Sequence, residues 1–174
     1  KSFDQSELQP APTKHFAILT CMDARMDPYK FAGLNDGEAH IIRNAGGRAT
    51  DDAIRSLIIS HKFLGTLEWF VIHHTNCGMT LVTDEKIGEL LDDDLETAVF
   101  DGENWFNPPR ESSNNAKPGS DAGKCMQWHT FTDLNQSVLN DMNTIKNHPL
   151  VPSHIRVYGF IFDVKTGKLA PVTA

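Results

Sequence analysis

The sequence predicts an α/β fold built on one mostly parallel β-sheet with helices on its faces. Two observations lead to this prediction. Short apolar runs alternate along the chain with stretches of helical periodicity, and this repetition of strand and crossover helix is typical of parallel sheets. The last apolar run is followed by a turn and a short return strand, which predicts an antiparallel strand at the sheet edge. The expected strand order is 2-1-3-4, with the return strand at the edge.

Four apolar runs supply the strands of this sheet. They cover residues 15–20, 39–43, 67–72 and 155–164. The turn Lys165-Thr166-Gly167-Lys168 then leads into the return strand at residues 169–172.

Three helices are expected between the strands. Thr50 is a plausible N-cap for the first, because Asp51 and Asp52 place acidic charge in its first turn and apolar residues recur at helical spacing until near Gly65. A short second helix covers residues 84–91, and a third is indicated by helical periodicity over residues 134–145.

The chain is expected to form a single domain over residues 1–174, since its length is that of one domain and it contains no internal repeat. Residues from about 92 to 127 show neither the alternation of a strand nor the periodicity of a helix. Aspartates, prolines, serines and asparagines dominate there, which predicts an irregular insertion.

Composition restricts the class of protein. The chain is 40% hydrophobic and 22% charged, with a net charge of −7, which argues against a nucleic-acid binder and against an anionic membrane surface as partner. No stretch approaches the roughly 18 apolar residues that a membrane helix requires. Three cysteines are an odd number at low density, which favours a reducing compartment, and we expect the cytoplasm.

Two polar clusters come directly after apolar strands. The first is Cys21-x-Asp23-x-Arg25, and the second is the run His73-His74-Thr75-Asn76-Cys77-Gly78. Ligands of open parallel sheets bind beyond the carboxyl ends of strands, where the strand order reverses. In the order 2-1-3-4 the first and third strands are neighbours, so the two clusters are expected to converge.

Two thiolates and an imidazole form a three-ligand zinc set, as in catalytic zinc sites that leave a fourth position to water or substrate. Cys21 and Cys77 supply the thiolates. His74 is the expected imidazole, and His73 is the alternative, since strand alternation separates the two only weakly. Cys125 is interpreted as a spare thiol. The remaining histidines are expected to be solvated or in the core: His15, His40, His61, His129, His148 and His154.

The motif Cys21-x-Asp23-x-Arg25, followed about fifty residues later by His74-x-x-Cys77-Gly78, resembles the motifs of the β-class carbonic anhydrases. The resemblance extends from about residue 14 to 168, apart from the insertion, and includes Arg43-Asn44-Ala45-Gly46 after the second strand. Within the family, the stretches 37–47 and 73–79 look most like the branch that contains carbonyl sulfide hydrolase.

This resemblance implies one zinc ion per chain, held by Cys21, His74 and Cys77. It also implies a catalytic dyad of Asp23 and Arg25. Zinc lowers the pKa of a bound water towards neutrality, so the resulting hydroxide is the expected nucleophile. Asp23 would accept the proton of that hydroxide in a hydrogen bond, and Arg25 would keep Asp23 ionised and oriented. The alternative for this pair is a local surface salt bridge that contributes little.

Gly46 and Gly78 are candidates for the substrate pocket, because glycine allows the backbone to approach a ligand closely. The alternative is that both are ordinary turn glycines. The family resemblance also implies a homodimer or homotetramer, and the apolar return strand at the sheet edge supports this, since an uncovered edge is hazardous.

The expected reaction is hydrolysis of carbonyl sulfide to hydrogen sulfide and carbon dioxide. Hydration of carbon dioxide to bicarbonate, the carbonic anhydrase reaction, is the alternative. A non-catalytic zinc-stabilised module, with Asp23 as a fourth ligand, is a further hypothesis. A thiol redox protein using Cys21 and Cys77 is disfavoured, because the chain has no Cys-x-x-Cys motif.

Overall fold

The computed structural model describes residues 5–109 and 118–173. Within it the chain divides into two compact units. The first consists of the residues up to Cys77 together with those from Asp133 onward, and the second is Gly78–Thr132. The predicted insertion at residues 92–127 lies inside the second unit.

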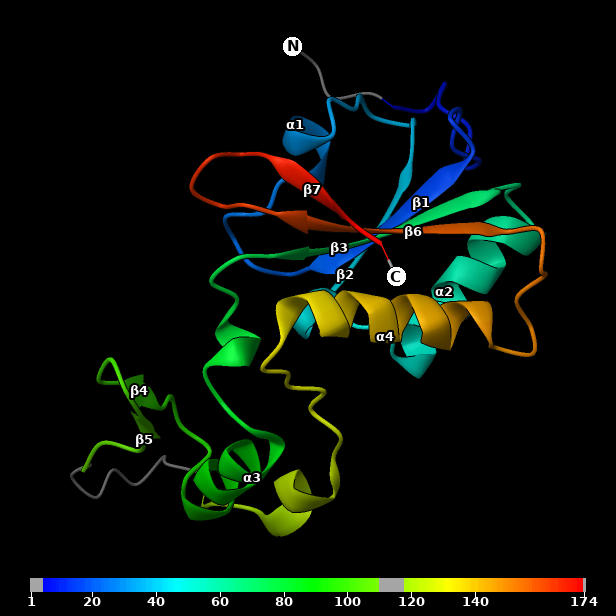
Figure 1. Ribbon diagram of the computed structural model, residues 1–174. Coiled ribbons are helices and arrows are strands. Elements are labelled where there is room, and N and C mark those ends of the chain that lie inside the picture. Colours follow the sequence, from blue (N-terminus) through cyan, green and yellow to red (C-terminus); the bar gives the residue numbers. More distant parts are fainter. Residues whose placement is uncertain (1–4, 110–117, 174) are drawn as a thin grey trace. The chain divides into compact units, whose positions relative to one another are not determined.

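A five-stranded sheet forms the centre of the first unit, in the order β2-β1-β3-β6-β7 (Figure 1). The first four strands are parallel to their neighbours, and β7 is antiparallel to β6. This confirms the predicted fold class, strand order and antiparallel edge strand. The strand bounds are β1 (Phe16–Cys21), β2 (His40–Asn44), β3 (Glu68–His74), β6 (Arg156–Phe162) and β7 (Leu169–Val172).

Helices cover the two faces of this sheet unequally (Figure 1). Helices α2 (Asp51–Lys62) and α4 (Leu134–Lys146) pack on one face, where they form the main core with alternate residues of β1 and β3. The four-residue helix α1 (Pro28–Phe31) packs on the opposite face, against a smaller apolar cluster. Thr50 accepts a hydrogen bond from the Ala53 amide and so caps α2 as predicted.

Most strand ends differ from those expected by one or two residues, and two of these differences have a clear physical cause. β1 begins at Phe16 because His15 has a positive φ of 55°, which is incompatible with a strand. β3 continues to His74, two residues further than predicted. Both His73 and His74 are fully buried and lie opposite Ile161 and Phe162 of β6, so tertiary pairing extends a strand that the polar sequence suggested had ended.

Residues 78–109 and 118–132 of the second unit form short elements. They are the 3₁₀ helix η2 (Gly78–Thr80), helix α3 (Asp84–Asp93), the hairpin of β4 (Val99–Phe100) and β5 (Trp105–Phe106), and the 3₁₀ helix η3 (Asp121–Cys125). The Asp84 carboxylate accepts hydrogen bonds from the backbone of residues 128–130 and so ties α3 to the end of the unit. Two-residue strands leave no alternation in a sequence, which explains why residues 92–127 were expected to be irregular.

No helix among the described residues is long and apolar enough to cross a bilayer.

Candidate metal centre

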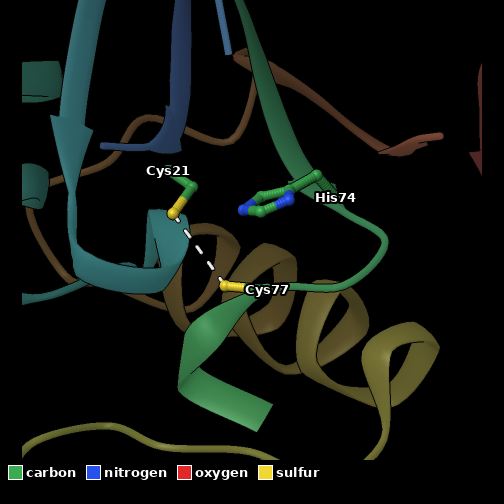
Figure 2. A group of neighbouring side chains, drawn as sticks. All are labelled: Cys21, His74 and Cys77. Carbon is green, nitrogen blue, oxygen red and sulfur yellow. Dashed lines mark hydrogen bonds between the residues drawn. The ribbon is translucent and has the colours of Figure 1, made fainter. Parts of the chain in front are cut away.

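Three buried side chains converge at the carboxyl edge of the sheet (Figure 2). Cys21 is the last residue of β1, His74 is the last residue of β3, and Cys77 lies in the loop that follows. β1 and β3 are parallel neighbours, with Thr20 opposite Ile72, so both strands deliver their last side chains to the same place. One ligand atom from each of the three side chains lies within 4.8 Å of the other two, and the Cys21 and Cys77 sulfur atoms are 3.9 Å apart.

The state of His74 tests whether this cluster fits a metal ion. Its Nδ1 lies 3.0 Å from the carbonyl oxygen of Thr75. Because a carbonyl can only accept, Nδ1 carries the proton and Nε2 keeps its lone pair. Nε2 is buried and forms no hydrogen bond within residues 5–109 and 118–173. In the neutral ring with its proton on Nδ1, the lone pair of Nε2 lies beside two sulfur atoms, which is what a metal ion with soft ligands requires.

The charge state of Cys21 also fits a metal. Its thiol pKa falls to about 4. The largest cause is the hydrogen bond with the Cys77 thiol; burial acts in the opposite direction, and His74 with the backbone amides of Asp23 and Gly46 lowers the pKa further. The thiolate is the form that binds metal ions, so the surroundings of Cys21 favour the ligating form.

His73, the alternative imidazole, points elsewhere. Its ring nitrogens lie 3.2 Å from Ser137 Oγ and 3.1 Å from Asp141 Oδ2, both on α4. Within the described chain, therefore, the structure brings His74 and not His73 to the two cysteines.

Asp23 lies beside the cluster but belongs to an ion pair. Arg25 donates from its backbone amide and Nε to Asp23 Oδ1, both at 2.9 Å, and from a terminal nitrogen to Oδ2 at 2.6 Å. These hydrogen bonds from Arg25 hold the pKa of the Asp23 carboxyl well below its usual range, against the effect of burial. Oδ2 lies 3.8 Å from Nε2 of His74, so an ionised carboxylate faces the cluster from its edge.

Two arginines fasten the loops that carry these groups. Arg25 also donates to the carbonyl oxygen of Asn76 at 2.8 Å, which joins the loop after β1 to the loop after β3. Arg43 donates to the carbonyl oxygens of Cys21 and Asp23, at 3.0 and 2.7 Å. Arg43 belongs to the Arg43-Asn44-Ala45-Gly46 stretch of the family resemblance, which assigned it no role. Its position at the end of the strand adjacent to β1 is the signal that would have suggested one.

The glycines near the cluster differ in importance. Gly46 is buried with a φ of 79° in the 3₁₀ helix η1 (Ala45–Gly47), a conformation that favours glycine. Gly47, which sequence reasoning did not single out, has a φ of 71°, and a Cβ there would lie 2.8 Å from the Cys21 backbone nitrogen. Gly78 is exposed, and a Cβ at that position would meet nothing within 4 Å. Its place in a substrate pocket stays a prediction without support from packing.

The other candidate ligands lie outside the cluster. Cys125 is exposed at the end of η3. His40 pairs with Ser60 Oγ, and His61 with the carbonyl oxygen of Thr66.

Comparison with known proteins decides the family. The model of the carbonic anhydrase family matches residues 16–169. β-Carbonic anhydrase 1 of Mycobacterium tuberculosis is 40% identical over 164 residues, which cover 93% of this chain and 84% of that protein. The chain belongs to the β-carbonic anhydrase family.

Relatives within the β-carbonic anhydrase family carry two kinds of name. A carbonic anhydrase structure from Streptococcus mutans is 39% identical and has a TM-score of 0.80. The match covers 98% of this chain and 88% of the Streptococcus mutans chain. A carbon disulfide hydrolase of Acidithiobacillus thiooxidans is 35% identical over 159 residues, 88% of this chain and 75% of that protein. The predicted resemblance to the family is therefore confirmed, and its relatives include enzymes named for an oxygen substrate and for a sulfur substrate.

Proposed function

We propose that this protein is a zinc enzyme that adds water to a small linear molecule of the type X=C=Y, with carbonyl sulfide as its preferred substrate. The observation that supports this most directly is the buried Cys21–His74–Cys77 cluster with an ionised Asp23 at its edge. One relative is named a carbonic anhydrase and another a carbon disulfide hydrolase. Carbonyl sulfide, with one oxygen and one sulfur atom, lies chemically between carbon dioxide and carbon disulfide, so these names support it as a substrate.

One zinc ion per chain would be held by Cys21, His74 and Cys77. Two thiolates and a neutral imidazole are a known set of three ligands for catalytic zinc. When bound there, zinc supplies the activation of a water molecule near neutral pH.

Asp23 and Arg25 then orient the reacting water. Asp23 Oδ2 accepts only one hydrogen bond from Arg25. A carboxylate oxygen has capacity for a second, so Oδ2 can accept a proton from the attacking water in a hydrogen bond. Arg25 keeps this carboxylate ionised and fixed in orientation through three hydrogen bonds, so Asp23 functions as an acceptor throughout the neutral pH range.

Hydration of carbon dioxide is the second candidate. The relative with 40% identity is named a β-carbonic anhydrase, and the same residues would perform the same addition to carbon dioxide. Since both substrates are linear, neutral and similar in size, the pocket beyond the metal must decide between them.

We expect carbonyl sulfide to be hydrolysed with higher catalytic efficiency than carbon dioxide is hydrated. A pocket discriminates such close analogues by only about 1–3 kcal/mol, or roughly 10–200-fold, so the preference should be graded. The measurement is a comparison of kcat/KM for both gases on one zinc-loaded preparation under identical conditions.

A metal-depleted sample is the control for the uncatalysed reactions. Near-diffusion-limited hydration of carbon dioxide with negligible sulfide release would establish the second candidate. Full zinc loading without turnover of either gas would favour the non-catalytic module.

We further propose that the protein is a homodimer or homotetramer. The sheet face opposite α2 and α4 is aromatic, and α1 is the one helix of the described residues that packs on it: Phe70 contacts Phe16, Tyr158 and Phe160 at ring distances of 5.2–6.1 Å. A groove on this face is lined by apolar side chains only. Pro171 in β7 cannot donate a hydrogen bond to a further strand, so this face supports the proposal more strongly than the edge does.

Phe70→Glu is expected to lower the mass of the assembly, because it places a charge in the middle of the apolar face. Phe63→Glu is the matched control, since Phe63 is 73% exposed after α2, and it should leave the mass unchanged. Light scattering at micromolar concentration provides the measurement. A wild-type protein with the mass of a single chain would contradict the proposal.

We also propose a cytoplasmic location. Metal binding requires Cys21 and Cys77 as reduced thiolates with their sulfur atoms 3.9 Å apart, and a reducing compartment protects such a pair from oxidation.

A further inference from the structure

A buried polar cluster lies behind the metal centre. It consists of His73 on β3, Ser137 and Asp141 on α4, and Arg48, which follows η1. Arg48 donates from Nε to Asp141 Oδ2 at 2.8 Å and from a terminal nitrogen to Oδ1 at 3.2 Å. His73 Nε2 lies 3.1 Å from Asp141 Oδ2, and Ser137 Oγ lies 3.2 Å from His73 Nδ1.

Asp141 is the centre of this cluster and is an unusual residue for its position. It lies on the face of α4 that also carries Val138 and Ile145, both fully buried, and is itself only 4% exposed. Burial raises the pKa of its carboxyl, but the adjacent His73 ring and the hydrogen bonds from Arg48 outweigh this and lower the pKa overall. Asp141 is therefore ionised, and burying an ion is costly unless its partners satisfy it. A helix needs no such residue in order to pack.

Both partners of Asp141 lie next to parts of the chain that hold or contact a ligand of the metal centre. His73 directly precedes His74 in β3. On the other side, the Arg48 amide donates to Asn44 Oδ1 at 2.7 Å, and the Asn44 side chain donates back to the Arg48 carbonyl at 2.8 Å. This ring of hydrogen bonds closes η1, whose Gly47 lies directly against the Cys21 backbone.

We propose that Asp141 is a positioning residue for the metal centre. Through Arg48 it holds η1 against Cys21, and through His73 it holds the end of β3 that carries His74. One carboxylate on α4 thus fixes the separation between ligands that come from two different strands. This inference rests on the proposed zinc site but not on the identity of the substrate.

The test is Asp141→Asn, an isosteric change that removes the charge. Oδ2 faces both Arg48 Nε and His73 Nε2, while Oδ1 accepts from a terminal nitrogen of Arg48. An amide oxygen can replace only one of these two acceptors, and the NH₂ group in the other place opposes a donor, so the two-point contact with Arg48 breaks. Outer partners of metal ligands typically contribute about 10–100-fold to metal affinity. Asp141 contacts no ligand itself and acts through His73 and Arg48. We therefore expect zinc affinity to fall by about tenfold, the low end of that range.

Two readouts separate positioning from general stability. Zinc affinity is measured by competition with a chelator, and ligand geometry by the visible absorption spectrum of the cobalt-substituted protein. Val138→Ala is the matched control, since it truncates a fully buried side chain on the same helix face that lies against Gly159 of β6. We expect Asp141→Asn to change the cobalt spectrum and the affinity, and Val138→Ala to lower stability to denaturant while leaving both unchanged.

A second variant covers the case in which Asp141→Asn does not fold. Arg48→Lys keeps the positive charge but loses the two-point contact with Asp141, so it should cause a smaller change of the same kind. A wild-type cobalt spectrum and zinc affinity in the folded variants, or equal changes in Val138→Ala, would overturn the inference. Absence of turnover in the zinc-loaded wild type would instead overturn the proposed function, because neither readout used here depends on turnover.

Discussion

Cys77→Ala should bind almost no zinc after dialysis, whereas the wild-type protein should hold one ion per chain. The substitution removes one of two thiolates and leaves Cys21 and His74, and two protein ligands are fewer than the three or four of known zinc sites. Turnover should disappear with the metal. Metal analysis of the purified, dialysed variant is the measurement.

Cys125→Ala is the matched control for this prediction. Cys125 is exposed and lies outside the cluster, so the same substitution there should retain full zinc content. If Cys77→Ala kept its zinc, the assignment of the three ligands would be wrong.

Asp23→Asn is expected to keep its fold and its zinc yet lose most of its activity. The amide can present an N–H donor where the carboxylate presents only acceptors, so the attacking water would be misoriented. Misplacing a reacting group by about 1 Å can cost roughly 10²-fold in rate, which sets the expected fall in kcat. Steady-state kinetics together with metal analysis of the same sample measures both quantities.

Asp27→Asn provides the control for the loss of one negative charge near the centre. Asp27 is the N-cap of α1, and asparagine caps helices as well as aspartate does, so this variant should keep wild-type activity. Near-normal turnover in Asp23→Asn would reduce the Asp23–Arg25 pair to a surface salt bridge.

The parallel sheet and its order were predictable because apolar strands alternate with helical periods along almost the whole first unit. Element ends were less predictable. His73 and His74 read as the end of a strand because both are polar, yet β6 pairs with both of them. The short α1 was missed, since four residues after a capping aspartate leave no periodic signal.

The candidate ligands were predictable for a similar reason: ligand-type residues follow two apolar strands that the fold makes neighbours. The sequence left His73 and His74 as alternatives, because the difference between them depends on what packs against each face of β3. Ser137 and Asp141 supply that information, and both lie far along the chain. Asp141 did leave a signal, since it is an acidic residue within the apolar stripe of α4.

The parallel pairing of β1 with β3 links metal binding to folding. Cys21 and the His74–Cys77 pair are distant in sequence and meet only once these strands are aligned. The unfolded chain therefore offers a two-donor fragment of the site, which binds zinc far more weakly than the native three donors do. A ligand present at 100 times its dissociation constant stabilises the native state by about 2.7 kcal/mol when the unfolded state does not bind it. Chelation should accordingly lower the melting temperature of the wild-type protein, so that metal supply in the cell would also set how much of the chain stays folded.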